Sequence, residues 1–437
     1  MGSYGFDKII LWILKLGLWA IPILPLYIST SLLFPFITGK NLVFRIVVEI
    51  LFTLWAGLAV LRPEFRPRLT LLFKAVTIFI TVLFLADLLG PNPYRSFFSN
   101  YERMEGFMML SHLYLYFVVL SSVFKTRKDW LIFFHMTLAV SIIVGFIGVL
   151  QKLGLRVSLQ GGYRVDSTIG NPTYLASYLL FHIWLLVMLL YESRKKWWLA
   201  SLYGSVLIFE LTILYFTATR GAVLALLSTL ILFVLSVVWF FYKIFPPRKD
   251  PNLHTAKSWG RRIALAALAM VLILPVVLWQ IRSTNFVSSN QVLNRLTNYS
   301  LEETTVKSRF MIWKMSWNGF LERPILGWGQ ENYYLVFQKY FDPGLYAQEP
   351  WFDRSHNVIL DWLVHAGLLG FLSYLSIIAT AIYMIIYGMK RDLLNYWQGF
   401  VLMALFVAHF FQNLFVFDNL NTYLLFFAFL AYIQTSA

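Results

Sequence analysis

Long apolar runs separated by polar connections dominate the chain. A helix needs roughly 20 apolar residues to cross a bilayer. The stretch from Ser205 to Tyr242 is too long for one crossing, and the segment 217–221 divides it. The pattern therefore predicts an all-α polytopic membrane protein with about 12 transmembrane helices, near residues 8–32, 41–61, 70–89, 106–124, 129–151, 171–191, 197–218, 221–242, 262–281, 357–388, 393–413 and 417–435.

The composition is also that of a membrane protein. Of the 437 residues, 59% are hydrophobic and 13% are charged, and the mean hydropathy is +0.68. A soluble protein of this length would carry far more charge. The first apolar run continues through Leu24 toward Phe34 without the cleavage site of a signal peptide, so we expect Met1 to remain in the cytoplasm. Cysteine is absent, which excludes disulfides, thiol catalysis and a zinc–thiolate site.

Basic residues set the expected orientation. Lys and Arg number 36 against 21 Asp and Glu, and their clusters fall at alternate connections. The positive-inside rule places these connections, and with them both termini, in the cytoplasm. The net charge of +15 also favours anionic partners, including membrane lipids, and nucleic acid is a poor alternative in so apolar a chain. The clusters lie at 62–68, 125–128, 194–196, 243–262 and 390–391.

Several arginines fall in connections expected on the outer side. The insertion bias disfavours arginine there, so their presence needs another reason. An anionic ligand at the outer face supplies one, because the planar and permanently charged guanidinium group suits phosphate. These residues are Arg95, Arg103, Arg156, Arg164, Arg220, Arg309 and Arg354.

The longest outer connection is expected to form a helical extracytoplasmic cap between spans 9 and 10. Phe310, Trp313 and Trp317 recur there at helical spacing with basic residues between them, which predicts a helix on the outer leaflet. Pro324 ends this helix. We therefore divide the chain into transmembrane helices 1–9 at 1–281, the extracytoplasmic segment at 282–355, and transmembrane helices 10–12 at 356–437.

One histidine stands at the boundary between that segment and the next apolar run. Gly367 and Gly370 follow His356 in the same run. If the run is one helix, His356 and Gly367 lie on one face about three turns apart, and the glycines let a neighbouring helix approach closely. An imidazole that titrates near neutrality can take a proton from a hydroxyl, so His356 is the candidate general base. A capping or interface histidine is the alternative.

Three arginines are candidates for binding phosphate. Arg220 lies between two apolar spans, where it could equally reach the head groups as an anchor. Arg309 lies on the predicted surface helix, where basic residues also simply face lipid phosphates. Arg164 precedes Asn171–Pro172, a helix start that suits phosphate, and pairing with Asp166 is the alternative.

Other polar residues near these outer ends are auxiliary candidates. The Glu102–Gly106 cluster is rich in charge, and local ion pairing is the alternative to a catalytic role there. Walker, dinucleotide-binding and HExxH motifs are absent, and the first outer loop, 35–40, has no carboxylate. We therefore expect neither a cofactor nor a metal. The auxiliary candidates are Glu102, Arg103, Asp353 and Asn357.

An ordered set of these pieces resembles the O-antigen ligase and O-antigen polymerase superfamily of bacterial membrane glycosyltransferases. The most specific piece is His356–Asn357 followed by the spaced glycines Gly367 and Gly370. The set spans about half of the chain in the family's order. Its other members are Ser167–Pro172, Thr219–Gly221, and Arg309 with Trp313 ahead of Arg323–Gly329.

The resemblance implies a GT-C-like, metal-independent and inverting glycosyltransferase whose donor is an undecaprenyl-diphosphate-linked glycan. By matching positions, Arg220 and Arg309 would hold the donor diphosphate, and His356 would activate the acceptor hydroxyl. Charge and position add Arg164 and Arg354 to the diphosphate site. The enzyme would act at the outer, periplasmic face of the bacterial cytoplasmic (inner) membrane. Its acceptor would be lipid A-core or another glycan.

Other functions remain open at this point. A polysaccharide polymerase or a protein O-oligosaccharyltransferase would use the same residues with a different acceptor. A flippase or exporter of lipid-linked oligosaccharide would also be basic and polytopic, but its arginines should line a cavity reachable from both sides of the membrane. The candidate residues here cluster at the outer ends of spans, which favours an enzyme.

Overall fold

The computed structural model describes residues 2–158, 162–243, 251–298, 304–346 and 351–436. In these residues the chain forms helices and no β-strand, as the apolar pattern predicted. The α-helices are α1 (Gly2–Ala20), α2 (Thr38–Leu61), α3 (Leu71–Leu88), α4 (Pro93–Phe98), α5 (Phe107–Val123), α6 (Arg127–Lys152), α7 (Pro172–Glu192), α8 (Trp197–Phe216), α9 (Arg220–Lys243), α10 (Pro251–Gln280), α11 (Asn285–Ser288), α12 (Gln291–Thr297), α13 (Thr304–Glu322), α14 (Tyr333–Lys339), α15 (Val358–Lys390), α16 (Tyr396–Gln412) and α17 (Leu420–Ser436). The 3-10 helices are η1 (Ile21–Leu26), η2 (Pro63–Phe65) and η3 (Pro343–Leu345).

The described helices make the chain a multi-pass membrane protein. By length and apolar composition, 8 of them can cross a membrane. Every range predicted to span contains a helix, but α5 and the apolar part of α10, Leu268–Gln280, are shorter. Helices α16 and α17 have 17 residues each. These dimensions support many crossings without establishing the expected count of about 12.

Local sequence explains where several helices begin. Asn171 caps α7, because its Oδ1 accepts a hydrogen bond of 2.8 Å from the Thr173 amide, and Pro172 takes the first helical position. This is the helix start predicted from the sequence. At the start of α6, Thr126 and Asp129 form a reciprocal capping box. Such caps satisfy amides that have no partner within the helix.

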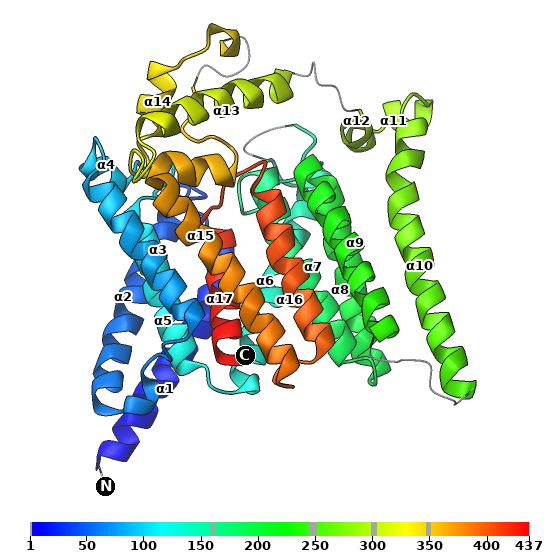
Figure 1. Ribbon diagram of the computed structural model, residues 1–437, viewed down its shortest axis with the longest axis horizontal. Coiled ribbons are helices and arrows are strands. Elements are labelled where there is room, and N and C mark those ends of the chain that lie inside the picture. Colours follow the sequence, from blue (N-terminus) through cyan, green and yellow to red (C-terminus); the bar gives the residue numbers. More distant parts are fainter. Residues whose placement is uncertain (1, 159–161, 244–250, 299–303, 347–350, 437) are drawn as a thin grey trace.

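The long helices pack side by side into one bundle (Figure 1). Helix α15 packs along α3, α16 lies between α7 and α9, and α17 packs on α5. Helix α7 is central, since 83% of its most apolar stretch is buried inside the protein. Helices α9 and α16 approach closely at Gly221, where an added Cβ would lie 2.8 Å from Oε1 of Gln412. The small residue permits this contact.

The helices between α10 and α15 lie across the end of the bundle at which α15 begins (Figure 1). Helix α13 packs on α14 and α15. Ile312, Met315 and Val336 are buried there in a small hydrophobic core of their own. Helix α13 ends at Glu322, two residues before Pro324, at the stop predicted from the sequence.

Helix α15 is broken rather than continuous. Ala366 and Gly367 have φ values of −135° and 63°, so two helical segments meet there at a kink. His356 lies before the helix with a φ of 51°, and Asn357 is the N-cap. The prediction that His356 and Gly367 share one helical face is therefore wrong, because it assumed an unbroken helix that includes the histidine.

A loop of residues 323–329 fills the kink. The Trp328 amide donates to the Val364 carbonyl at 2.8 Å, and the Leu368 amide donates to the Pro324 carbonyl at 2.7 Å. These bonds use backbone groups that the break in α15 leaves without helical partners. The loop 323–329 thereby supplies hydrogen-bond partners to the backbone of α15 at the break in the helix.

The two signature glycines differ in their surroundings. A Cβ on Gly367 would overlap the Ile325 carbonyl, so glycine is required by close approach as well as by its positive φ. Gly370 lies against Ala366 of its own helix. The close approach expected at Gly367 exists, but its partner is the loop 323–329 and not a neighbouring helix.

Candidate functional site

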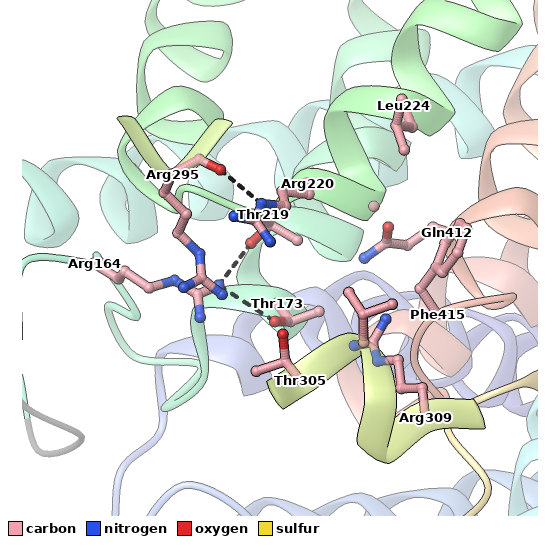
Figure 2. A pocket seen from close by; sticks show the side chains of 12 residues that line it. Arg164, Thr173, Thr219, Arg220, Leu224, Arg295, Thr305, Arg309, Gln412 and Phe415 are labelled. Atoms are coloured by element: carbon pink, nitrogen blue, oxygen red, sulfur yellow. Dashed lines mark hydrogen bonds between the residues drawn. The ribbon is translucent and has the colours of Figure 1, made fainter. Parts of the chain in front are cut away.

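A cavity of ≈ 320 Å³ lies between α13 and the ends of α7, α9 and α16 (Figure 2). Arginines reach it from four separate segments of the chain, and none of the described residues that line it is acidic. The site is therefore strongly cationic. Its lining residues are Arg164, Thr173, Thr219, Arg220, Gly221, Leu224, Arg295, Thr305, Val306, Arg309, Gln412 and Phe415.

The turn between α8 and α9 anchors two of the arginines. Ala218 has a φ of 48°, which reverses the chain direction after α8. Arg164 Nε donates to the Thr217 carbonyl at 2.8 Å, and Arg295 Nε donates to the Ala218 carbonyl at 3.2 Å. Both guanidinium groups thus sit at the carbonyl end of α8, where the helix dipole favours cations. Arg164 makes these contacts in place of the pairing with Asp166 left open by the sequence.

Arg220 is the first residue of α9, and its side chain binds α12 and the residue that directly follows this helix. Its Nε donates to the Arg295 carbonyl at 2.6 Å, and its Nη2 donates to the Asn298 carbonyl at 2.8 Å. Arg295 in turn donates to the α8–α9 turn, so α12 and this turn hold each other in place. Arg220 therefore shapes the cavity wall as well as contributing charge to it.

Arg295 was not among the residues predicted from the sequence to lie at the site. The residue lies on α12, a helix of only 7 residues inside a polar segment without a hydrophobic period. The one available signal was an arginine in an outer connection, the same signal that pointed to Arg164. The close packing of α12 against the α8–α9 turn brings it into the cavity wall.

Burial and neighbouring positive charge both act on Arg164 in this cavity. Burial, followed by the charge of Arg295, lowers the pKa of Arg164 to about 10. Arg164 still carries its proton at neutral pH. An anion in the cavity would relieve the repulsion among these groups, which favours a ligand of high negative charge.

His356 lies beside the cavity and not among its lining residues. Its ring packs between Phe352 and Phe417, with centroid distances of 5.6 Å and 5.1 Å. Burial, and then the positive charge of Arg309, lower the pKa of His356 to about 4. The imidazole is therefore neutral at pH 7, which is the form that accepts a proton.

Arg354 is held in a buried ion cluster. Its guanidinium lies 2.9 Å from the Glu105 carboxylate and 2.6 Å from that of Glu331. Although burial opposes the charged form, Glu331 and Glu105 raise the pKa of Arg354. Arg354 is not among the residues that line the cavity, so the structure does not bring it to the predicted diphosphate site. Its charge is satisfied by two carboxylates distant in sequence.

Arg103 and Asp353 form a second ion pair in the same region. Arg103 Nε and Nη2 donate to the two carboxylate oxygens of Asp353 at 2.6 Å and 3.2 Å. Burial raises the pKa of Asp353, but the charge of Arg103 outweighs it and lowers that pKa overall. Glu102 is more exposed and lies 3.6 Å from Arg103. These contacts are the local ion pairing that the sequence left as the alternative to a catalytic role.

Residues 353–357, here called the His356 strap, are fixed on both sides of the histidine. The Ser355 amide donates to Asp361 Oδ1 at 2.8 Å, and its hydroxyl donates to the same oxygen. Trp313 of α13 donates from Nε1 to the Ser355 carbonyl at 3.1 Å. Asn357 Oδ1 accepts hydrogen bonds from the Ile359 and Leu360 amides in the first turn of α15. The strap therefore holds His356 at a defined place next to α13.

Comparison with known proteins finds a family that part of the chain resembles. Residues 204–375 match the family model described as O-antigen ligase. This match supports, over that segment, the resemblance to the O-antigen ligase superfamily seen in the sequence. The matched segment includes Arg220, Arg295, Arg309 and His356, together with the kink at Gly367. No curated protein matches the chain.

The match to the O-antigen ligase family agrees with the multi-pass helical architecture, since members of that family are membrane glycosyltransferase-like enzymes. The family implies a lipid-linked glycan and an acceptor in the membrane. The segments Ser167–Pro172 and Thr219–Gly221 meet through Thr219, which lines the cavity and whose hydroxyl donates to the Pro172 carbonyl at 3.3 Å. Pieces far apart in sequence thus form one site.

Proposed function

We propose that the chain transfers a glycan from a polyprenyl-diphosphate carrier, undecaprenyl diphosphate in bacteria, to a hydroxyl group of an acceptor in the membrane. The observation that carries this proposal is the convergence of Arg164, Arg220, Arg295 and Arg309 on one cavity. Guanidinium groups bind phosphate oxygens through strong, charge-assisted hydrogen bonds. A lipid-linked glycan, the ligand class that the family implies, carries this chemistry in its diphosphate.

The diphosphate is the leaving group in the proposed reaction. The acceptor oxygen attacks the anomeric carbon from the face opposite the diphosphate. The bond from that carbon to the phosphate oxygen breaks with its electron pair, and the configuration inverts. Arg220 and Arg309 stabilise the negative charge that develops on the departing oxygen. Because the guanidinium groups supply the positive charge, we propose that no divalent ion is required.

His356 is the proposed general base. It takes the proton of the acceptor hydroxyl as the new glycosidic bond forms, a contribution of about 100- to 10,000-fold in rate. The low pKa of His356 supports this role, because the ring is neutral at the pH of the reaction. The His356 strap and its contact with α13 keep the base at a constant position relative to Arg309.

Two of the charged residues have supporting roles in this proposal. Arg354 and Arg103 pair with carboxylates and hold the His356 strap, so we assign them to positioning and not to the diphosphate. Such buried pairs leave an uncompensated charge when one partner is removed. Asp353 and Glu105 complete the pairs, and Glu102 borders them at the surface.

We propose that the site faces the outer side of the bacterial cytoplasmic membrane, with both termini in the cytoplasm. Figure 1 shows both chain ends at the end of the bundle away from α13. The basic connections 125–128 and 194–196 belong to the cytoplasmic side by the positive-inside rule. The arrangement supports a site that meets its lipid-linked donor on the outer leaflet.

A defined transfer assay tests the proposed function. Purified protein is given an undecaprenyl-diphosphate glycan and, separately, lipid A-core, a second lipid-linked glycan or a pilin-like protein, each without and with a metal chelator. We expect product with lipid A-core, which is the activity of a ligase. Product with one of the other acceptors would identify a polymerase or a protein glycosyltransferase. Loss of all transfer on adding chelator would refute the metal-free mechanism, and translocation of the donor across vesicles without transfer would indicate a flippase.

A further inference from the structure

One face of α13 is exposed and combines basic with aromatic side chains. Lys307, Phe310, Lys314, Trp317 and Leu321 follow one another at intervals of three or four residues, so they share one side of the helix. The exposed fractions are 55% for Phe310, 48% for Trp317 and 57% for Leu321, and both lysines are exposed. None of the five is acidic. These residues are called the α13 face below.

The other sides of α13 are occupied. Ile312 and Ser316 are buried toward α14, where Ser316 bonds with the Tyr333 hydroxyl at 2.9 Å. Arg309 lies at the cavity (Figure 2), and Trp313 binds the strap. Within the described part of the chain, the α13 face is thus the side of the helix that remains exposed.

The α13 face continues onto the outer surface of α15. Just beyond the end of α13, Ile325 is 66% exposed, and its carbonyl accepts a hydrogen bond of 3.3 Å from the Leu369 amide. Leu368 and Leu369 are 47% and 46% exposed, and Leu372 is 51% exposed. They begin the second segment of α15, a helix with the length and composition of a membrane span. Exposed leucines on such a helix are covered by acyl chains.

We propose that the α13 face binds the anionic phospholipids of the membrane in which the protein sits. Its position at the upper end of a lipid-covered surface corresponds to the level of the head groups. Lys307 and Lys314 pair there with phosphates, and their apolar stems lie along the interface. Phe310 and Trp317 lie in the membrane–water interface, which aromatic side chains favour. Leu321 enters the acyl layer.

This interaction goes beyond the proposed glycan transfer and does not depend on it. The same helix carries Arg309 toward the cavity and Trp313 toward the His356 strap. A lipid contact on a neighbouring side of α13 therefore fixes the helix relative to the membrane, and with it one wall of the cavity.

The absence of cysteine makes the depth of the α13 face directly measurable. A spin label is attached to Leu321→Cys, and to Gln338→Cys as the matched control on an exposed position of α14. In phosphatidylglycerol-containing nanodiscs we expect the label at 321 to be relaxed more by oxygen than by a water-soluble nickel complex, and the label at 338 to show the reverse. Equal access of the nickel complex to both positions would overturn the proposal. Shielding of position 321 from both reagents would also overturn it, because it would indicate a protein partner.

The charge of the α13 face is tested with two matched double variants. Lys307→Glu/Lys314→Glu reverses the charge, and Lys307→Arg/Lys314→Arg keeps it. For phosphatidylglycerol added to protein in zwitterionic micelles, we expect the first to weaken binding by at least roughly fivefold per lysine and the second to retain it. Free inorganic phosphate should not compete, since the site requires a lipid. Unchanged lipid affinity after charge reversal would contradict the proposal whether or not the protein transfers glycan.

Discussion

Trp313 Nε1 donates a hydrogen bond of 3.1 Å to the carbonyl of Ser355, the residue directly before His356. Trp313 also lies one helical turn after Arg309, which reaches the cavity. One helix therefore positions both a proposed diphosphate ligand and the proposed base. In the proposed mechanism, donor binding and proton removal thus depend on the same element, although the cavity does not include the histidine.

Replacing Trp313 by phenylalanine tests this connection. The Trp313→Phe variant keeps an aromatic ring but loses the donor to Ser355, so the strap is less well fixed. We expect kcat for glycan transfer to fall roughly tenfold, the equivalent of about one hydrogen bond, with little change in the donor KM. Trp198→Phe, at an exposed position near the start of α8, is the control and should transfer normally. A higher donor KM with normal kcat would assign Trp313 to donor binding instead.

Removing the proposed base should stop the reaction without preventing donor binding. For His356→Ala we expect the transfer rate to fall by about 100- to 10,000-fold. Donor affinity, measured by direct titration, and the thermal unfolding temperature should both stay close to those of the unmodified protein. Near-normal transfer by the purified variant would falsify the assignment of His356 as base.

Arg295 offers a test of the cavity that the sequence did not suggest. Arg295→Ala removes a charged ligand of the proposed diphosphate site, and we expect donor affinity to fall roughly tenfold or more, as for hydrogen bonds to charged groups. Acceptor affinity should not change. Arg156→Ala is the matched control, because Arg156 is an exposed outer arginine outside the cavity. Equal donor affinities for the two variants would remove the cavity from the mechanism.

The low pKa of His356 predicts a specific dependence on pH. The neutral ring is the active form, so kcat/KM should stay level as the pH falls from 8 to about 5 and decline as His356 is protonated near pH 4. Arg309 lowers this pKa, so Arg309→Gln should raise it and move the acid limb to higher pH. The measurement is kcat/KM for transfer from pH 3.5 to 8. An acid limb that stays in place, or moves to lower pH, would contradict the electrostatic link.

The kink in α15 can be tested with a pair of glycine substitutions. Gly367→Ala places a Cβ against the Ile325 carbonyl at a φ of 63°, and we expect a loss of stability of about 2 kcal/mol or more. Gly57→Ala on α2 is the control, because nothing lies within 4 Å of its new Cβ. It should be neutral or slightly stabilising. Thermal unfolding in detergent compares the two, and equal unfolding temperatures would show that the kink tolerates a side chain.

Much of the fold was predictable because it follows from local patterns. Apolar runs of sufficient length predict spanning helices, and Asn171–Pro172 predicts a helix start from the chemistry of its own side chains. Arg220 and Arg309 were expected at one site from the family resemblance and Arg164 from its charge and position, and the three line one cavity. In each case the decisive property belonged to a short stretch of sequence.

The misplaced features depend on contacts between distant segments. Arg354 carried the same sequence signal as Arg220, but its partner Glu105 lies 249 residues away and its pairing cannot be read from local charge. The kink at Gly367 was missed because a glycine is compatible with a helix until a second segment, the loop 323–329, enters beside it. Helix periodicity contains no information on that docking.

The kink at Gly367 also separates two mechanical roles within α15. The short upper segment is fastened to the protein through the strap and the loop 323–329. The long lower segment bonds to that loop only at its start, through Leu368 and Leu369, and then packs along α3 with exposed leucines on its outer side. A bilayer that thickens or thins changes the tilt of membrane-embedded helices. We expect such a tilt of the lower segment to turn about Gly367, so that the geometry around His356 changes less than the tilt itself.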